Sequence, residues 1–367
     1  MEPPSKLDLQ KIAEAFLCDG ASKKLEQYAT YLEFYEKVIC PSSIKDAVIL
    51  LDNPVFESHD SVIAFSKDLR ADPSQTHNEM MVRLNSSGSQ DKDKAAAIRS
   101  LVRVTFMLDC ESKQSYPAGF TLNDFVPLKW EHDVQFVDLV QGCFPRQDAT
   151  RNIRIRGALA QKKRLKAWKL KKRYNINFRA TDDIREHLLY DPEERSVKIF
   201  HHTGFLKAQL LRSLNQPIDL SFEESLKIGT LPPQLLLETL DSIHFVLFPI
   251  GTDSKSKRFL DKLVQKEGFD PNAKTDEGHV REPLDEFLYE FWGDRLLKLL
   301  DIVDNPPPAN WLVAWFERHT SERNALTVAI VGLFLSVIFS FLGLLVSIAQ
   351  LIFAILQWRV ALHPPQS

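Results

Sequence analysis

The chain has 367 residues with 46 basic and 49 acidic side chains, which gives a formal net charge of −3. Hydrophobic residues make up 44% and charged residues 26% of it, a globular composition that excludes a wholly disordered or fibrous protein. No C-x-x-C pair, G-x-G fingerprint, Walker A loop or G-x-S-x-G nucleophile turn occurs. The sequence therefore identifies no reaction. The order of its periodic segments predicts a mainly α fold: a helical cytosolic domain with a small β-hairpin, followed by a C-terminal transmembrane helix.

Residues 1–150 are predicted to form a helical N-terminal region. Apolar residues recur every three or four positions over 25–39, as on one face of an amphipathic helix that Pro41 ends. A second helix is expected at 43–53. Residues 85–94 contain nothing apolar and are expected to form a surface loop. A helix is predicted over 95–110, although the stretch RVTFML within it is also compatible with a strand.

Residues 151–174 form a basic segment, in which 151–173 hold eleven basic side chains and no acidic one. Such a charge excess suits anionic lipid headgroups, nucleic acid or the protein's own acidic surface. The hydrophobic segment further along the chain favours lipid over nucleic acid. The side chains expected to contact lipid or another anion are Lys162, Lys163, Arg164, Lys166, Trp168, Lys169, Lys171, Lys172 and Arg173.

Residues 175–305 are expected to complete the same cytosolic domain with a hairpin and further helices. Strands at 188–190 and 197–200 flank the polar turn DPEERS. The nearby His187, Asp191, His201 and His202 match no standard zinc spacing, and adjacent histidines in a strand point to opposite faces. We therefore expect structural or surface histidines, with no metal site and no cofactor.

Two strong helices are predicted at 233–248 and 284–304, each with an apolar stripe at helical spacing. Pro232 and Pro233 suit the first turn of the earlier helix. Residues 306–324 are interpreted as a proline-rich linker with a short helix at 311–318, whose Trp311 and Trp315 suit a membrane interface or ordinary packing.

The stretch 325–358 contains 34 residues without a charge and is predicted to cross a membrane. As one helix it would be about 51 Å long, against a hydrocarbon core of about 30 Å. A two-helix hairpin turning near 340–343 is the alternative. Small and polar side chains follow one continuous helical face, which favours a single helix and suits self-association. This packing face consists of Gly332, Ser336, Ser340, Gly343, Ser347 and Gln350.

The N-terminus lacks a basic stretch followed by an apolar one, so no secretory signal is indicated. Only the tail 359–367 follows the hydrophobic segment. This layout is typical of a tail-anchored protein with its N-terminal domain in the cytosol, and sparse cysteines suit that reducing compartment. The expected partners are the lipid bilayer, anionic headgroups and a second copy of the chain.

Four stretches carry a resemblance: HLLYDPEERSVKIFHHTGFLKAQL, LPPQLLLETLDSIHFVLFP, EFWGDRLLKLLDIVDNPPP and WLVAWFERHTSERNALTVAIVGLF. They resemble a large family of uncharacterised fungal proteins, whose members have a mostly helical cytosolic domain and one or two C-terminal membrane helices. The resemblance implies a fungal source and no activity. A weaker likeness to CorA-type metal-ion transporters lacks their Gly-Met-Asn signature.

These observations favour a membrane-anchored interaction or scaffold protein. The alternatives are a membrane-tethered hydrolase or metal-dependent enzyme and, less favoured, a component of an ion transporter. Convergence of His187, Asp191, His201 and His202 in one concave pocket would support the enzyme, and their dispersal would count against it.

Overall fold

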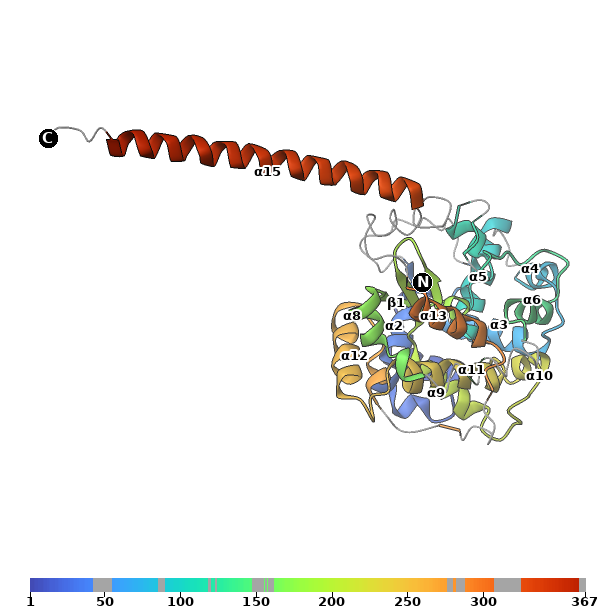
Figure 1. Cartoon of the computed structure of the whole chain (residues 1–367). Coiled ribbons are helices and arrows are strands. Elements are labelled where there is room, and N and C mark those ends of the chain that lie inside the picture. The colour runs from blue at the N-terminus through green and yellow to red at the C-terminus, as the bar shows by residue number, and fades with distance from the viewer. Residues whose placement is uncertain are drawn as a thin grey trace. The chain divides into compact units, whose positions relative to one another are not determined.

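The computed structural model describes residues 1–41, 55–84, 90–117, 120–122, 124–146, 155, 157, 162–275, 280–281, 288–306 and 325–362. The chain divides into an N-terminal unit, Met1–Asn305, and a C-terminal unit, Pro306–Ser367. The predicted fold class is confirmed, because helices dominate the described residues, the only sheet among them has three strands, and one long apolar helix lies at the C-terminal end (Figure 1).

The helices of the N-terminal unit are short, and most present one apolar face to the core. They are α1 (Lys6–Phe16), α2 (Ala29–Ile39), α3 (His59–Ala71), α4 (His77–Arg83), α5 (Asp91–Phe106), α6 (Phe136–Cys143), α8 (Ala167–Tyr174), α9 (Thr203–Arg212), α10 (Phe222–Lys227), α11 (Pro233–Asp241), α12 (Ser254–Lys266) and α13 (Gly293–Asp304). Single turns of tighter helix are η1 (Ala21–Lys23), η2 (Leu25–Tyr28), η4 (Ser112–Ser115), η5 (Lys162–Arg164), η6 (Ile184–Glu186) and η8 (Pro271–Lys274), and a π-helical turn, η7 (Ser242–Leu247), extends α11.

The small sheet has the strand order β1-β3-β2. The predicted hairpin is confirmed as β2 (Leu189–Asp191) paired antiparallel with β3 (Ser196–Phe200). Sequence reasoning missed β1 (Asn177–Thr181), which pairs with β3 in parallel. The parallel pair brings the ends of β1 and β3 to the same edge of the sheet.

The centre of the N-terminal unit is α9, which begins directly after β3. Its residues from Thr203 to Leu210 are all buried, and it packs against α11 and α2. Asp270, itself buried, fixes the start of α9, because its Oδ2 accepts the backbone N–H of Gly204 at 2.8 Å and the hydroxyl of Thr203 at 3.2 Å. These two hydrogen bonds to Asp270 fix the turn between β3 and α9.

Three predicted helix boundaries are wrong. The helix expected at 95–110 runs instead from Asp91 to Phe106, so the last residues of the loop expected at 85–94 are helical, and acidic side chains suit this first turn. The helix expected from 284 begins only at Gly293. There the buried carboxylate of Glu238 accepts the backbone N–H groups of residues 290–292, so these groups are not free to enter a helical ladder.

Two further helix predictions are confirmed, and two others fall outside the described residues. The segment 25–39 is helical as predicted, as η2 followed by α2, and the stretch RVTFML belongs largely to α5 rather than to a strand. The helix at 233–248 is confirmed as α11 and η7. The helices predicted at 43–53 and 311–318 lie outside the described residues.

The C-terminal unit contains α15 (Ala325–Leu362), a single uninterrupted helix of 38 residues. Its stretch Ile330–Trp358 is long and apolar enough to cross a membrane, and none of it is buried in the structure. The described backbone thus corresponds to the single helix rather than to the hairpin alternative.

Candidate functional site

The described part of the basic segment is tied to the N-terminal unit by one acidic residue. Asp253, which precedes α12, accepts hydrogen bonds from Lys166 Nζ at 2.6 Å and from the indole N–H of Trp168 at 2.9 Å. Partial burial opposes ionisation of Asp253, but these two donors outweigh it and hold the pKa of the carboxyl well below its usual value. Lys166 and Trp168 therefore bind an acidic residue of the protein itself, which is the alternative to lipid binding that the sequence left open.

The other predicted contact residues have mixed environments. Arg164 pairs with Asp304, Lys169 Nζ lies 2.9 Å from the carbonyl oxygen of Lys163, and Lys171 binds the side-chain oxygens of two asparagines. Lys172 and Arg173 are exposed, and neither has an ion-pair partner among the described residues. The side chain of Lys162 is not described.

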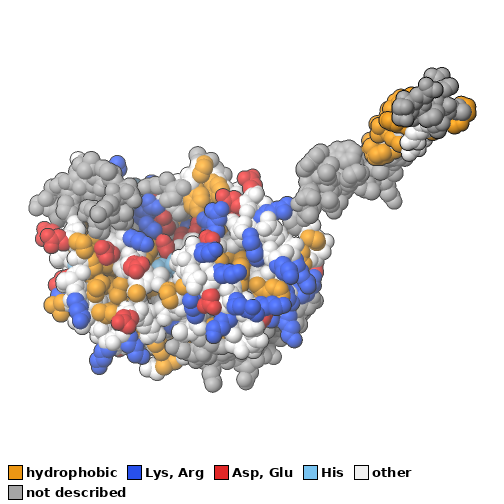
Figure 2. Space-filling view, turned by 90° about the vertical axis from the view of Figure 1, so that its left-hand side faces the viewer, with side chains coloured by type: hydrophobic (Ala, Val, Ile, Leu, Met, Phe, Trp, Pro, Cys, Tyr) orange, Lys and Arg blue, Asp and Glu red, His pale blue; other side chains and the backbone are white. Residues whose placement is uncertain are grey.

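α12 adds further positive charge beside α8, against which it packs. Lys255 Nζ lies 4.9 Å from the ring centre of Trp168, a cation–π contact. The exposed side chains of Lys257, Arg258 and Lys262 continue the charge along α12. We call the exposed basic side chains of α8 and α12 the basic face. Figure 2, which looks onto the side of the molecule where α8 and α12 lie in Figure 1, shows a dense group of Lys and Arg side chains.

A second site lies where β1 and β3 end. The parallel register pairs Thr181 with Phe200, so the residues that follow, Asp182 and His201, leave the same edge of the sheet side by side. In open sheets with parallel strands, functional side chains commonly follow the carboxyl ends of the strands. The structure adds His202, and we call these three residues the Asp–His–His cluster.

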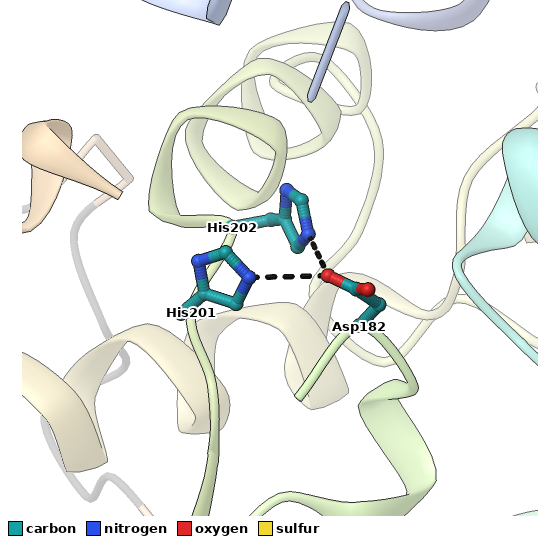
Figure 3. A group of neighbouring side chains, drawn as sticks. All are labelled: Asp182, His201 and His202. Carbon is teal, nitrogen blue, oxygen red and sulfur yellow. Dashed lines mark hydrogen bonds and ion pairs between the residues drawn. The ribbon is translucent and has the colours of Figure 1, made fainter. Parts of the chain in front are cut away.

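The cluster converges on one carboxylate oxygen (Figure 3). Asp182 Oδ1 lies 3.1 Å from His201 Nε2 and 2.7 Å from His202 Nε2. The side chain of Asp182 is 47% exposed, whereas those of His201 and His202 are 8% and 1% exposed. The three potential ligand atoms lie within 4.8 Å of one another. The cluster thus combines two buried imidazoles with a carboxylate that solvent can reach.

Burial sets the charge of the cluster. Desolvation lowers the pKa of His202, whose ring meets Phe34 edge-on at 5.3 Å, and the neighbouring His201 lowers it further. Partial burial acts against ionisation of Asp182, but hydrogen bonds from the two histidines outweigh it and hold its pKa well below the usual value. At neutral pH the cluster is therefore a neutral His202 ring beside an ionised carboxylate.

Asp182 also lines a polar cavity of about 410 Å³. Other acidic lining residues are Asp109, Asp183 and Glu186. Arg99 binds Asp109 at 2.6 and 2.8 Å, Lys198 binds Glu186 at 2.8 Å, and Asp183 accepts the backbone N–H of Arg185 at 2.9 Å. The carboxylate of Asp182 differs from these three because two imidazoles face it.

The predicted metal candidates are only partly brought together. His201 and His202 share the cluster, whereas His187 and Asp191 do not belong to it. His187 accepts the backbone N–H of Phe200 on Nδ1, and its Nε2 lies 2.7 Å from the Ser242 hydroxyl. Burial and the nearby Arg295 hold the pKa of His187 well below its usual value, so its ring is neutral. Asp191 instead caps the hairpin turn by accepting two backbone N–H groups.

The expectation that His201 and His202 point to opposite faces is wrong. That expectation holds within a strand, but β3 ends at Phe200 and His202 is the N-cap residue of α9. The turn between these elements aims both rings at Asp182. Asp182 was missed because its proximity follows from the undetected strand β1. The alternation of Ile176, Phe178 and Ala180 was the signal that could have revealed that strand.

The predicted packing face of α15 is present as a stripe of exposed residues on one helix. Two of its hydroxyls form hydrogen bonds within the helix: Ser336 Oγ donates to the carbonyl of Leu333 at 2.8 Å and Ser347 Oγ to that of Gly343 at 2.9 Å. Gly332 and Gly343 have open space where a side chain would start. Self-association through this face, including Ser340 and Gln350, stays a prediction.

No protein-family model, curated protein or solved structure matches this chain. The resemblance to uncharacterised fungal proteins therefore also stays a prediction.

Proposed function

We propose that this protein is anchored in a membrane by α15 and that its N-terminal unit serves there, on the cytosolic side, as an interaction or scaffold module. The observation that carries the proposal is the stretch Ile330–Trp358, an apolar helix of 29 residues with none of them buried.

The exposed surface of α15 supports anchoring. Nearly all of its described large apolar side chains are 46–68% exposed, from Ile348 at 46% to Phe339 at 68%. Soluble monomers rarely expose apolar patches larger than a few hundred Å². A buried core helix, the usual alternative for such a sequence, would have its apolar side chains covered. At 1.5 Å per residue the 29 residues extend about 43 Å, more than the hydrocarbon core of about 30 Å, so the helix would tilt or reach into the headgroups.

The state of the cysteines supports the cytosolic side. Cys18, Cys40, Cys110 and Cys143 form no disulfide, and the first three are buried. Cysteines kept as thiols in a folded unit are typical of a reducing compartment.

The basic face supplies a chemistry for the interaction. Its exposed lysines and arginines crowd together, and the pKa of Lys169 is lowered by partial burial and by neighbouring positive charges, of which Lys166 contributes most. An anionic membrane surface would relieve this repulsion, and each basic residue near such a surface contributes about 1 kcal/mol. We therefore propose anionic lipid headgroups as the partner of the basic face.

Alkaline carbonate extraction of membranes tests the anchoring. The parent chain should stay in the membrane pellet. A variant with Leu342→Arg and Leu345→Arg should be released, because each arginine near the centre of the span costs about 2.5–3.5 kcal/mol. The control, Leu342→Ile with Leu345→Ile, should stay in the pellet. Release of the parent chain would refute anchoring by α15.

Binding to lipid vesicles tests the partner. The full chain, reconstituted into neutral vesicles, should bind added vesicles that contain phosphatidylserine more tightly than added neutral vesicles. Added salt should weaken this difference in binding. Changing Lys172, Arg173, Lys257 and Lys262 to Gln should remove most of it. Gln at Lys6, Lys23, Lys37 and Lys67, four lysines elsewhere in the unit, is the matched control. If both variants lose the preference for phosphatidylserine equally, the binding depends on the net charge of the protein and not on the basic face.

A further inference from the structure

We propose that Asp182, His201 and His202 bind a divalent first-row transition-metal ion, such as Zn²⁺ or Fe²⁺, with an open coordination position toward the neighbouring cavity. This inference goes beyond the proposed function and does not depend on membrane anchoring.

The donor set determines the kind of metal. Two imidazole nitrogens and one carboxylate oxygen suit Zn²⁺ and Fe²⁺, whereas Mg²⁺ and Ca²⁺ prefer oxygen ligands alone. A site with three protein ligands leaves room for water or a substrate, the arrangement of catalytic rather than structural zinc sites. In this chain the free side would face solvent through the half-exposed Asp182.

The distances are close to those of a metal site. Ligands at about 2.0–2.2 Å from a tetrahedral ion lie ~3.3 Å apart. Asp182 Oδ1 is 3.1 Å from His201 Nε2 and 2.7 Å from His202 Nε2. Shifts of well under ~1 Å would thus bring each histidine nitrogen to a ligand's distance from Asp182 Oδ1, and the three ligand atoms already lie within 4.8 Å of one another. The ring centres of the two histidines, 4.1 Å apart, already place both Nε2 atoms on the same side (Figure 3).

The surrounding protein fixes the rings in the orientation that the metal needs. His202 is held between Phe34 at 5.3 Å and Phe200 at 5.7 Å, and His201 lies 6.1 Å from Phe269. The start of α9, anchored by Asp270, sets the backbone that carries both rings.

A purely structural reading of the cluster leaves part of it unexplained. Two buried rings converge on Asp182 Oδ1, while Asp182 Oδ2 accepts no hydrogen bond from the described residues. The Nδ1 atoms of both histidines are buried without a partner among the described residues. In the metal-free cluster each Nδ1 lacks a hydrogen-bond donor, and in the metal-bound cluster each would lack an acceptor, so these atoms favour neither form. Buried polar atoms without partners are uncommon, and the cluster is therefore not arranged for stability alone.

Cobalt titration tests the proposal on the full chain in detergent, prepared without a histidine tag. One equivalent of Co²⁺ should bind and produce visible d–d absorption bands, and Zn²⁺ should displace it. Asp182→Asn and His201→Gln should each weaken Co²⁺ binding at least about tenfold, since even changes outside the first ligand shell cost 10–100-fold. The matched controls, Asp191→Asn and His132→Gln, should bind Co²⁺ as the parent does.

Thermal unfolding with and without Zn²⁺ gives a second readout. Zn²⁺ should raise the Tm of the parent and of both controls, because a ligand that binds only the folded state stabilises it. It should not raise the Tm of Asp182→Asn, which alters an exposed side chain and should therefore still fold. Absence of Co²⁺ bands in the parent, or parent-like Co²⁺ binding by Asp182→Asn, would overturn the proposal.

Discussion

Replacing Glu238 by Gln should lower the free energy of unfolding of the N-terminal unit by about 1–6 kcal/mol. Glu238 is completely buried on α11, and four N–H donors surround its carboxylate. Oε1 accepts the backbone N–H of Glu290 at 2.6 Å and the side-chain amide of Gln234 at 3.0 Å. Oε2 accepts the backbone N–H groups of Phe291 at 2.9 Å and Trp292 at 3.0 Å. Burial raises the pKa of Glu238, and the four donors oppose that rise by stabilising the carboxylate.

The magnitude follows from these contacts. In the Gln variant an NH₂ group replaces one of the two oxygens and faces donors instead of accepting from them. Whichever oxygen is lost, at least one buried backbone N–H loses its acceptor, at a cost of about 1–3 kcal/mol. Burial raises the pKa of Glu238 to about 8, so a charge-assisted contribution from the remaining bonds is lost only above that pH. A cost near the upper end is expected if the NH₂ group faces both Phe291 and Trp292.

Urea unfolding of the full chain in detergent, followed by tryptophan fluorescence, measures this change. The matched control is Glu223→Gln on α10, where the side chain is half exposed and pairs with Lys227 at 2.6 Å. An exposed pair of this kind contributes less than about 0.5 kcal/mol. If Glu238→Gln costs no more than this control, the carboxylate does not hold residues 290–292, and our explanation of the late start of α13 fails.

Three further outcomes are expected. The free energy of unfolding should fall as pH drops below about 6.5, because His187 is neutral in the folded chain and takes up a proton on unfolding. His187→Gln should make that fall shallower in pH-dependent urea titrations. An unchanged slope would contradict the assignment. A second fall should begin below about pH 4, where Asp253 becomes protonated in the unfolded chain but stays ionised in the folded one. Asp253→Asn should make this fall shallower in the same titrations, and an unchanged slope would contradict the assignment. Gly332→Leu with Gly343→Leu should reduce association of two copies of the full chain in membranes by energy transfer, whereas Leu333→Ile should not, and equal association in both would show that the small residues form no interface.

The sequence predicted what depends on local patterns. The β2–β3 hairpin follows from two apolar runs around a polar turn, and α11 follows from its leading prolines and apolar stripe. The helical character of α15 and its apolar surface follow from composition alone. Each of these features is decided by residues that are close together in the chain.

Long-range contacts account for the misses. α13 begins at Gly293 because a carboxylate on α11 binds the preceding backbone, and no local pattern reveals that Glu238 lies there. The Asp–His–His cluster depends on the parallel pairing of β1 with β3, in which Thr181 meets Phe200. Without that register, Asp182 is one acid among many in the sequence, and strand alternation places His201 and His202 on opposite faces.

Glycosylation mapping tests most directly whether α15 spans a membrane with the N-terminal unit in the cytosol. The chain already carries one acceptor site, Asn85-Ser86-Ser87, and a second acceptor site can be appended after Ser367. Expressed with endoplasmic-reticulum membranes, the chain should receive a glycan at the appended site and none at Asn85, since only the lumenal side is glycosylated. A glycan at Asn85 would reverse the proposed orientation, and the absence of a glycan at the appended site would contradict a span by α15.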